Sequence, residues 1–269
     1  MSQLPFLLRL MDDASPRVRA KVAAELRLLG AGVWREIEAQ NLVLCEEQKR
    51  LLETILNEEA RSPDAILRSR WRGLQHISDE IEFLEAALLA LSQWQNGAIP
   101  AYGTALLDEI ATEFLETQFP RTATGLSHFL FEIRGLQGAD PDNYYEPLHS
   151  NFVHALEGGG ALPITLACVF ILVGARVGIR IEGCNFPGHF LARDARRQIV
   201  FDPYNGGKIL SPHEVDLLQK AAPSEMSAPA TSREIISRVL RNLSVAFHRE
   251  GQTEKSGFIL SLLRAMDGD

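Results

Sequence analysis

A histidine and an aspartate in the second half of the chain have the spacing of an acid–base pair. His189 stands in "NFPGHFLARD", directly after a Pro-Gly turn, and Asp202 stands in "IVFDPYNGG". If these segments are neighbouring antiparallel strands, position 202 lies close to position 189, and the carboxylate can orient the imidazole. Such a pair supplies the base and its orienting group for nucleophilic catalysis, and only the nucleophile is missing.

Two cysteines are candidate thiols for this pair. Cys168 lies in the most apolar part of "GALPITLACVFILVGARVGI", where burial raises a thiol pKa and makes the group unreactive, so a structural role is expected. Cys184 comes five residues before His189, near the end of a strand, and is the thiol closest to the histidine in sequence.

Two further kinds of site are considered and set aside. The run Gly158-Gly159-Gly160 before a helix could bind phosphate, but Ala161-Leu162-Pro163 follows where a phosphate loop needs Gly-Lys-Ser/Thr. His149 and His154, five residues apart, could join His189 and Asp202 around a metal only through tertiary structure. The sequence therefore predicts no metal and no cofactor.

The segments before residue 121 read as successive helices that form a scaffold. Apolar residues recur at helical spacing through residues 1–120, and residues 5–30 resemble one HEAT-type hairpin, with Pro16 opening its second helix and Gly30 ending it. A later helix is expected to begin with a capping box at Ser78, although Ile81 replaces the usual Glu or Gln.

The periodicity changes in residues 121–220, the predicted core. "IRIEGCNF", "HFLARD" and "QIVFDPY" read as three antiparallel strands. The apolar run before them is about four residues short of the roughly 20 that cross a membrane and is closed by Arg176, so it is predicted to be a buried central helix. The fold class is α+β and predominantly helical.

The C-terminal part is predicted to be a linker and a helical hairpin. Residues 221–232 are rich in Ala, Pro and Ser, as linkers are. Residues 233–269 resemble one tetratricopeptide unit. One such unit cannot bury its own apolar face, so the hairpin is expected to dock on the rest of the chain.

Composition limits the function classes. The chain has 269 residues, 46% of them hydrophobic and 23% charged, which is typical of a globular protein. A net charge of -8 without a basic patch argues against nucleic acid as a partner. Three scattered cysteines, an N-terminus unlike a signal peptide and the absence of a spanning segment favour a cytoplasmic protein outside the membrane.

Several ordered motifs resemble a known family. The chain, over about residues 75 to 265, is similar to the SirB family of bacterial proteins, whose fold resembles that of transglutaminases and papain-type proteins. The motifs that carry this resemblance are "NYYEPLHSNF", "GALPITLACVFILVGARVGI", "FPGHFLAR", "FDPYNGGKIL" and "SREIISRVLRNL".

The resemblance implies a set of site residues with one substitution. Catalytic members of the wider superfamily carry a cysteine at the start of the core helix, paired with a histidine and an aspartate. His189 and Asp202 match the last two, but Pro163 stands at the cysteine position. Thr165 lies about 200° further round the helix and points elsewhere. The residues expected to line the cleft are Pro163, Asn205 and Tyr145.

Three functions remain open at this point. The first is a non-catalytic or weakly catalytic interaction or regulatory module that binds a protein or peptide. The second is a hydrolase or acyltransferase that works without a cysteine, using His189 and Asp202 on a bound water. The third is a structural role, in which the pair only joins two strands.

Overall fold

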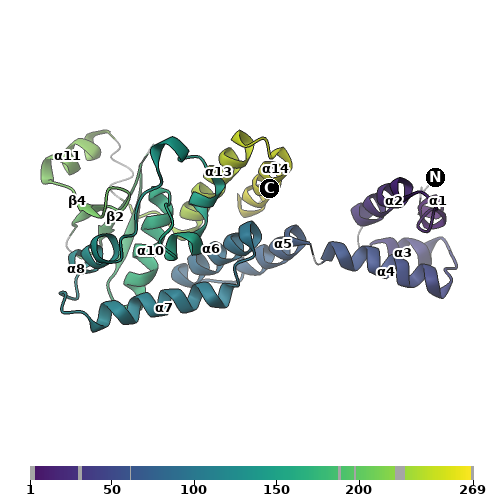
Figure 1. Cartoon of the computed structure of the whole chain (residues 1–269), viewed down its shortest axis with the longest axis horizontal. Coiled ribbons are helices and arrows are strands. Elements are labelled where there is room, and N and C mark those ends of the chain that lie inside the picture. The colour runs from purple at the N-terminus through teal and green to yellow at the C-terminus, as the bar shows by residue number, and fades with distance from the viewer. Residues whose placement is uncertain are drawn as a thin grey trace. The chain divides into compact units, whose positions relative to one another are not determined.

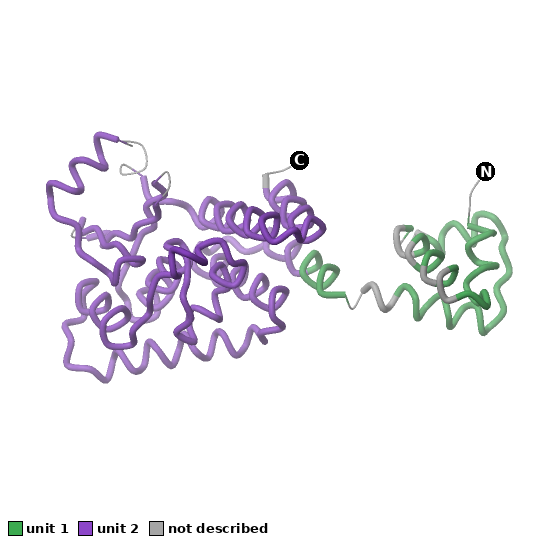
Figure 2. Tube along the Cα trace, turned by 45° about the horizontal axis from the view of Figure 1, so that its top comes forward, with its two compact units in different colours: residues 1–69 green, residues 70–269 purple. Residues whose placement is uncertain are grey.

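The structure is a computed structural model that describes residues 4–29, 32–60, 62–186, 189–196, 198–221 and 228–267. The chain divides into two compact units, residues 1–69 and residues 70–269 (Figure 2). The predicted boundaries at residues 120, 220 and 232, between the helical scaffold, the core, the linker and the C-terminal hairpin, stay a prediction. Gly30, the Pro187-Gly188 turn and residues 222–227 of the predicted linker lie outside the described residues.

The first unit is helical. Its apolar core is built from residues such as Leu8, Leu26 and Leu52, all buried. Helix α2 begins at Pro16, as predicted, because proline has the φ of a helix and lacks the N–H that a first turn leaves unpaired. The helices are α1 (Leu4–Arg9), α2 (Pro16–Leu29), α3 (Gly32–Ala39), α4 (Glu46–Ala60) and α5 (Pro63–Leu74), the last of which continues into the second unit.

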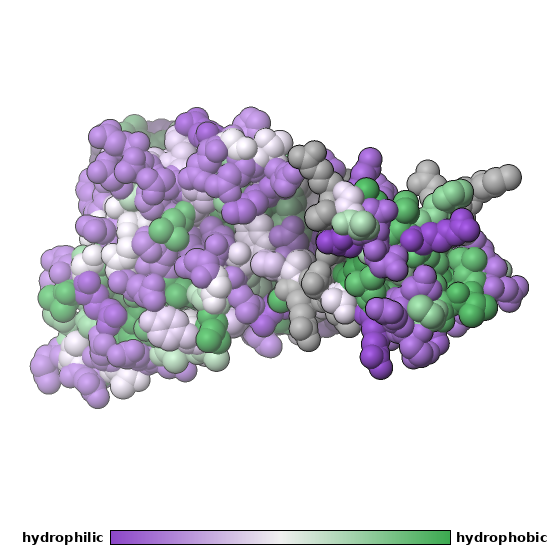
Figure 3. Space-filling view, turned by 45° about the vertical axis from the view of Figure 1, so that its right-hand side comes forward, coloured by the Kyte–Doolittle hydropathy of each residue, from purple (hydrophilic) through white to green (hydrophobic). Residues whose placement is uncertain are grey.

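The second unit contains most of the helices and the sheet (Figure 1). On the face shown in Figure 3, hydrophilic side chains predominate over this larger unit. Its helices before the sheet are α6 (Glu80–Asn96), α7 (Pro100–Glu116), α8 (Ala123–His128), η1 (Phe129–Ile133), η2 (Pro141–Asn143), η3 (Pro147–Ser150), α9 (Phe152–Leu156) and α10 (Pro163–Arg176).

Helix α10 is the centre of this unit. Every residue from 163 to 174 is buried, which explains why its apolar residues follow no single face. Helices α6, α7 and α9 pack on it, and so do the first two strands. Arg176 closes the helix by donating to Asp108 at 2.6 Å and Glu85 at 2.9 Å. No helix among the described residues is both long and apolar enough to span a bilayer.

Four antiparallel strands form the sheet in sequence order. They are β1 (Ile181–Phe186), β2 (His189–Asp194), β3 (Val200–Asp202) and β4 (Lys208–Ile209). The first three match the predicted strands. The two-residue β4 was not predicted, because its pairing with β3 follows from a tight turn rather than from any alternation in its own sequence.

Different helices pack on the two faces of the sheet. On one face, Phe201 of β3 stacks edge-on against Phe170 of α10 at 5.3 Å between ring centroids. On the other face, Cys184, Leu191 and Val200 form an apolar cluster with Val215 of α11 (Pro212–Ala221). The predominantly helical α+β fold, with a central helix on a small antiparallel sheet, is therefore confirmed.

The C-terminal hairpin is part of the second unit and packs on its other helices, as expected. It consists of α13 (Ser232–Arg249) and α14 (Thr253–Asp267), and α13 packs on α6. Thr231 and Glu234 form a complete capping box at the start of α13. The Ser232 backbone N–H also donates to the Glu80 carboxylate at 2.6 Å, which links this helix start to α6.

Candidate functional site

His189 and Asp202 form the predicted pair. The His189 Nε2 atom lies 2.9 Å from Asp202 Oδ2, a hydrogen-bond distance. The His189 side chain is 35% exposed, whereas the Asp202 side chain is only 6% exposed. A buried carboxylate therefore holds an imidazole that solvent can reach, which is the arrangement that a general base or a pH-sensitive recognition group requires.

The pair shifts the pKa of both members. The hydrogen bond that His189 donates to Asp202 is the main reason that the pKa of His189 lies above its usual value, against the opposing effects of burial and of Arg238. Burial acts to raise the pKa of Asp202, but hydrogen bonds from His189 and Asn205 together place it below its usual value. At neutral pH the carboxylate is charged and fixes the ring.

Asn205 completes the fixation of the carboxylate. Its side-chain amide donates to Asp202 Oδ2 at 2.7 Å, and its backbone N–H lies 3.3 Å from Oδ1. The turn that follows, Gly206-Gly207, has positive φ at both residues, which places β4 back beside β3. The sequence expected Asn205 in the cleft, and the structure gives this exposed residue a definite contact with the pair.

The start of α10 carries no nucleophilic side chain. Pro163 is buried in the first turn. Residues on both sides of Pro163 are hydrogen-bonded to His149, whose backbone carbonyl accepts from Leu162 N at 3.0 Å and from the Thr165 hydroxyl at 3.1 Å. Thr165 is thus buried and occupied by a structural hydrogen bond, in agreement with the sequence argument that it points away from the site.

The direction of β1 brings the histidine toward the level of Pro163. The 14 residues of α10 and the six residues of β1 each extend over a length of about 20 Å. The start of β1 lies beside the end of α10, since a Cβ on Gly174 would contact Ile181. Because side chains two residues apart on a strand share a face, His189 lies on the same face of the sheet as Leu191, which packs on α11. Pro163 begins α10, which covers the opposite face of the sheet.

A group of aromatic and basic side chains surrounds this end of the sheet. Tyr144 stacks edge-on with Tyr145 at 5.2 Å and lies 6.0 Å from the Tyr204 ring. The Arg249 guanidinium lies 3.6 Å from the Tyr145 ring centroid. We call the set the tyrosine–arginine surface; its residues are Tyr144, Tyr145, Tyr204, Arg238 and Arg249.

Arg238 connects this surface to His189. Its Nη1 donates to the Phe186 carbonyl at 2.6 Å and to the Asn185 side chain, at the end of β1. Burial lowers its pKa, and its charge acts on both Tyr144 and His189. Sequence reasoning missed Arg238 because it lies on α13, in a segment that the pattern assigned to a separate helical hairpin.

Tyr145, the third residue expected in the cleft, is 46% exposed and forms the outer part of the surface with Arg249. Tyr204 is held from the other side, because its hydroxyl donates to the Ala139 carbonyl at 2.7 Å. The "NYYEPLHSNF" segment thus places two aromatic rings beside the His189 end of the sheet.

Neither candidate thiol is reactive in this environment. Cys168 and Cys184 are both fully buried. Burial raises the pKa of Cys184 to about 11 and raises the pKa of Cys168 still further. Both thiols are therefore protonated at neutral pH. The exposed Cys45 belongs to the first unit.

The histidines of "HSNFVH" have packing roles. The His154 ring lies against Gly159, where an added Cβ would come within 2.1 Å of Nε2. Burial, and next His149, lower the pKa of His154. Within the described part of the chain, no three His, Cys, Asp or Glu side chains gather as metal ligands would.

Comparison with known proteins decides the family. A family model described as the transglutaminase-like superfamily matches residues 103–241, just over half of the chain, from α7 to α13. The chain belongs to the transglutaminase-like superfamily. Within that superfamily, the match covers Pro163, His189 and Asp202, together with most of the tyrosine–arginine surface.

Curated relatives of this superfamily member come from bacteria and animals. A UPF0162 protein of Xylella fastidiosa (strain Temecula1) is 30% identical over 200 residues, 67% of this chain and 70% of the relative. A UPF0162 protein of Pseudomonas aeruginosa is 29% identical over 168 residues, 59% of this chain and 62% of the relative. Human F-box only protein 21 is 23% identical over 137 residues, 47% of this chain and 22% of that protein. No solved structure matches.

Proposed function

We propose that this protein is a non-catalytic, transglutaminase-like interaction module that binds an acidic peptide segment of a partner at the tyrosine–arginine surface. The observation that carries the proposal is the proline at the start of α10 in a chain whose His189–Asp202 pair is intact. Cysteine chemistry needs a thiol at this helix start, where the helix dipole lowers the thiol pKa. Proline supplies none.

The composition of the surface supports binding. Tyrosine and arginine are the residues that most often dominate the energy of protein interfaces. Arg238 and Arg249 have no carboxylate partner in the described part of the chain, although the protein as a whole carries a net charge of -8. Two arginines without acidic partners in the described part of the chain, beside the exposed Tyr145 and the partly buried Tyr144 and Tyr204, match a peptide that carries Asp or Glu.

Three further assignments belong to this proposal. The chain is a SirB-type member of the superfamily, on the ordered motifs given above. The α13–α14 hairpin is a tetratricopeptide-like unit that has become part of the core. The protein acts in the cytoplasm, in keeping with three free cysteines, one of them exposed.

A peptide-binding measurement tests the proposal. Fluorescently labelled peptides in two matched sets, rich in Asp/Glu and rich in Lys/Arg, are titrated with the full chain. Acidic peptides should bind, and Tyr145→Ala and Arg249→Gln should each weaken them about tenfold, or about 1.4 kcal/mol. Arg241→Gln changes an exposed arginine outside the surface and serves as the control. Equal binding of both peptide sets, or equal loss in the control, contradicts the proposal.

A second function is favoured by one specific observation. The His189–Asp202–Asn205 hydrogen bonds leave a partly exposed imidazole oriented to activate a water. We infer a Cys-independent hydrolase or acyltransferase as the alternative. Amide, ester and peptide substrates are screened with the wild-type chain and His189→Ala. Turnover that disappears in the variant supports this alternative and argues against the non-catalytic module; turnover that persists in the variant, or none at all, removes it.

A further inference from the structure

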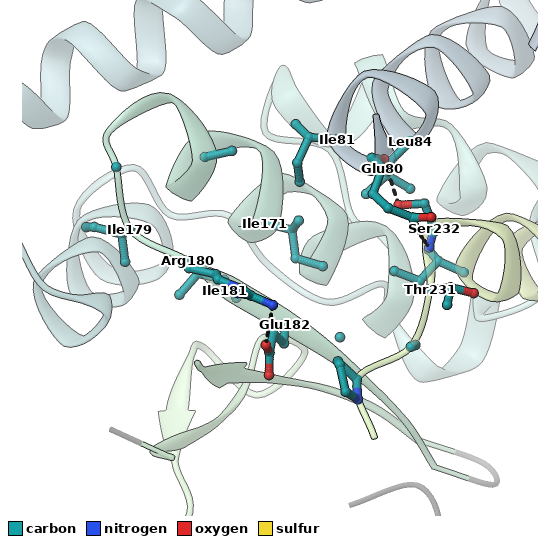
Figure 4. Close-up of a pocket in the computed structure, with 16 residues that line it drawn as sticks. Glu80, Ile81, Leu84, Ile171, Ile179, Arg180, Ile181, Glu182, Thr231 and Ser232 are labelled. Atoms are coloured by element: carbon teal, nitrogen blue, oxygen red, sulfur yellow. Dashed lines mark hydrogen bonds and ion pairs between the residues drawn. The ribbon is translucent and has the colours of Figure 1, made fainter. Parts of the chain in front are cut away.

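A cavity of about 660 Å³ lies beside the outer edge of β1, in the second unit. It is bounded by α6, the end of α10, β1 and the start of α13. Figure 4 shows Ile81 of α6 and Ile171 of α10 on one side and the Arg180–Glu182 pair along β1 on the other. We call it the β1 cavity. Its aliphatic lining side chains are Ile81, Leu84, Ile171, Ile179, Ile181 and Ile235.

The volume and lining suit an aliphatic chain. Ligand pockets in proteins measure about 300 to 1,000 Å³ and are mostly apolar, with a few placed polar groups. The aliphatic residues of the β1 cavity come from three helices and a strand, so the space is not a gap along one element. A branched aliphatic wall without an aromatic ring favours a flexible hydrocarbon chain over a flat ring, which would stack on aromatic side chains.

The acidic groups at its rim are already paired. The Glu182 carboxylate accepts from Arg180 at 3.1 Å and from Arg193 at 2.9 Å. The Glu80 carboxylate accepts the Ser232 backbone N–H at 2.6 Å, as the dashed line in Figure 4 shows. A cationic ligand group would have to displace these contacts, so the rim does not favour a cation.

A second, smaller cavity of about 150 Å³ adjoins the first. The two share Gly178, Ile179 and Arg180 in their walls. The other charged residues that line the smaller cavity are Arg121, Arg196 and Asp194, and Asp194 accepts the Arg196 backbone N–H at 2.8 Å. We call it the arginine cavity, because three arginines and one aspartate line it. Because arginines outnumber carboxylates in this lining, the smaller cavity favours an anionic ligand group, and guanidinium groups bind carboxylates and phosphates well.

We propose that the two cavities form one binding site for an anionic amphiphile, a ligand with an aliphatic chain and a terminal carboxylate or phosphate. The chain occupies the β1 cavity and the anionic group lies in the arginine cavity, with Arg180 at the junction. The Arg180 side chain is 75% exposed, so it is free to turn from Glu182 to an incoming anion. The site is separate from the tyrosine–arginine surface and does not depend on the function proposed for that surface.

Calorimetric titration of the full chain with decanoate tests the site. Decyltrimethylammonium, with an equal chain and the opposite charge, and acetate, without the chain, are the comparison ligands. Decanoate should bind at least tenfold more tightly than either. Ala175→Phe, which adds a ring from the cavity wall at an exposed helix position, should remove binding, and Arg180→Gln should weaken it about tenfold.

Two variants control for nonspecific effects. Ala105→Phe adds the same ring to an exposed position of α7 outside both cavities, and Arg241→Gln removes an exposed arginine of α13. Both should bind decanoate as the wild type does. If Ala175→Phe fails to fold, as judged by its thermal transition, Arg180→Gln and the comparison ligands still decide the outcome.

Three results would overturn the proposal. Absence of decanoate binding removes the site, and equal binding of decyltrimethylammonium removes the role of the arginines. Decanoate binding that neither Ala175→Phe nor Arg180→Gln changes places the ligand elsewhere. Vesicles of phosphatidylglycerol distinguish a lipid surface from a free ligand: Arg180-dependent vesicle binding without decanoate binding indicates a membrane headgroup and contradicts a site that encloses the chain.

Discussion

At the scale of single residues, the His189–Asp202 pair makes stability depend on pH in two directions. The raised pKa of His189 stabilises the fold below the ordinary histidine value of 6.5, and this contribution is lost as the pH rises through the folded pKa. The lowered pKa of Asp202 stabilises the fold above the ordinary aspartate value of 3.8, and this contribution is lost as the pH falls through the folded pKa. The pair therefore contributes most between these limits.

Removing the charge of Asp202 tests this coupling. In Asp202→Asn the pKa of His189 should fall toward or below 6.5, because the charged acceptor is lost while burial and Arg238 remain. The measurement is an NMR titration of the His189 ring. Asp216→Asn, at an exposed acid paired with Lys220, is the control and should leave the titration of His189 unchanged. An unchanged value in Asp202→Asn would show that the hydrogen bond does not set the pKa.

Pro163 can be tested as the position of the missing nucleophile. In Pro163→Cys the introduced thiol lies in the first turn of α10, where the helix dipole lowers a thiol pKa and burial raises it. At pH 7 we expect it to react with iodoacetamide faster than the buried Cys168 but more slowly than the exposed Cys45, as followed by mass spectrometry.

The same experiment contains its own controls. The buried Cys168 and Cys184 should stay unlabelled, which shows that the fold is intact. Adding His189→Ala should leave the rate of the introduced thiol unchanged, because His189 lies on the α11 face of the sheet. A slower rate in the double variant would contradict this and would show that the histidine reaches the start of α10.

At the scale of elements, the turn between β3 and β4 depends on two glycines for different reasons. Gly206 and Gly207 have φ of 68° and 70°, in the left-handed region that other residues avoid. A Cβ on Gly206 would meet nothing within 4 Å, but one on Gly207 would come within 2.4 Å of the Phe131 ring. Gly206 is required only for its left-handed backbone conformation. Gly207 is required for that conformation and also because the Phe131 ring leaves no room for a side chain.

Matched alanine variants separate these two roles. Gly206→Ala should cost about 1 kcal/mol of unfolding free energy, the cost of a left-handed alanine. Gly207→Ala should cost about 2 to 4 kcal/mol, because the displaced Phe131 ring adds an overpacking penalty. Urea denaturation measures both. Equal losses in the two variants would mean that the Phe131 side chain moves aside freely.

The elements could be predicted from the sequence where local pattern decides them, and not where tertiary contacts do. The strands β1 to β3 are visible in the sequence because side chains alternate between the two faces of a strand, and the start of α10 is visible because proline has the φ of a first helical turn. Both are local properties of the chain. The cap of α6 was expected at Ser78 but is Asp79, whose carboxylate accepts the Glu82 N–H at 2.8 Å. Neighbouring Ser and Asp are both good caps, so the pattern could not choose between them.

The candidate site was predictable in part for the same reason. His189 and Asp202 are joined by a hairpin, and a hairpin register follows from turn length and alternation. Arg238 lies 49 positions from His189 in sequence and reaches the sheet only because α13 docks on the second unit. No local pattern carries that information. The β1 cavity, bounded by α6, α10, β1 and α13, was unpredictable for the same reason.

At the scale of the whole molecule, each unit has a core of its own. Leu26 is completely buried among apolar residues of the first unit, and Leu240 is completely buried in α13 of the second. Because hydrophobic stabilisation arises inside each core, a cavity made in one should act on that unit first. The alternative is that the 269 residues unfold as one cooperative body.

Leu26→Ala and Leu240→Ala distinguish these possibilities. Each substitution should destabilise its own unit by about 2 to 5 kcal/mol, because it leaves a cavity where the side chain was fully buried. Hydrogen exchange followed by mass spectrometry should show Leu26→Ala raising exchange in residues 4–60 alone, and Leu240→Ala raising it in residues 70–267 alone. Raised exchange across both units in either variant would mean that they unfold together, in which case ligand binding at the β1 cavity would also stabilise the first unit.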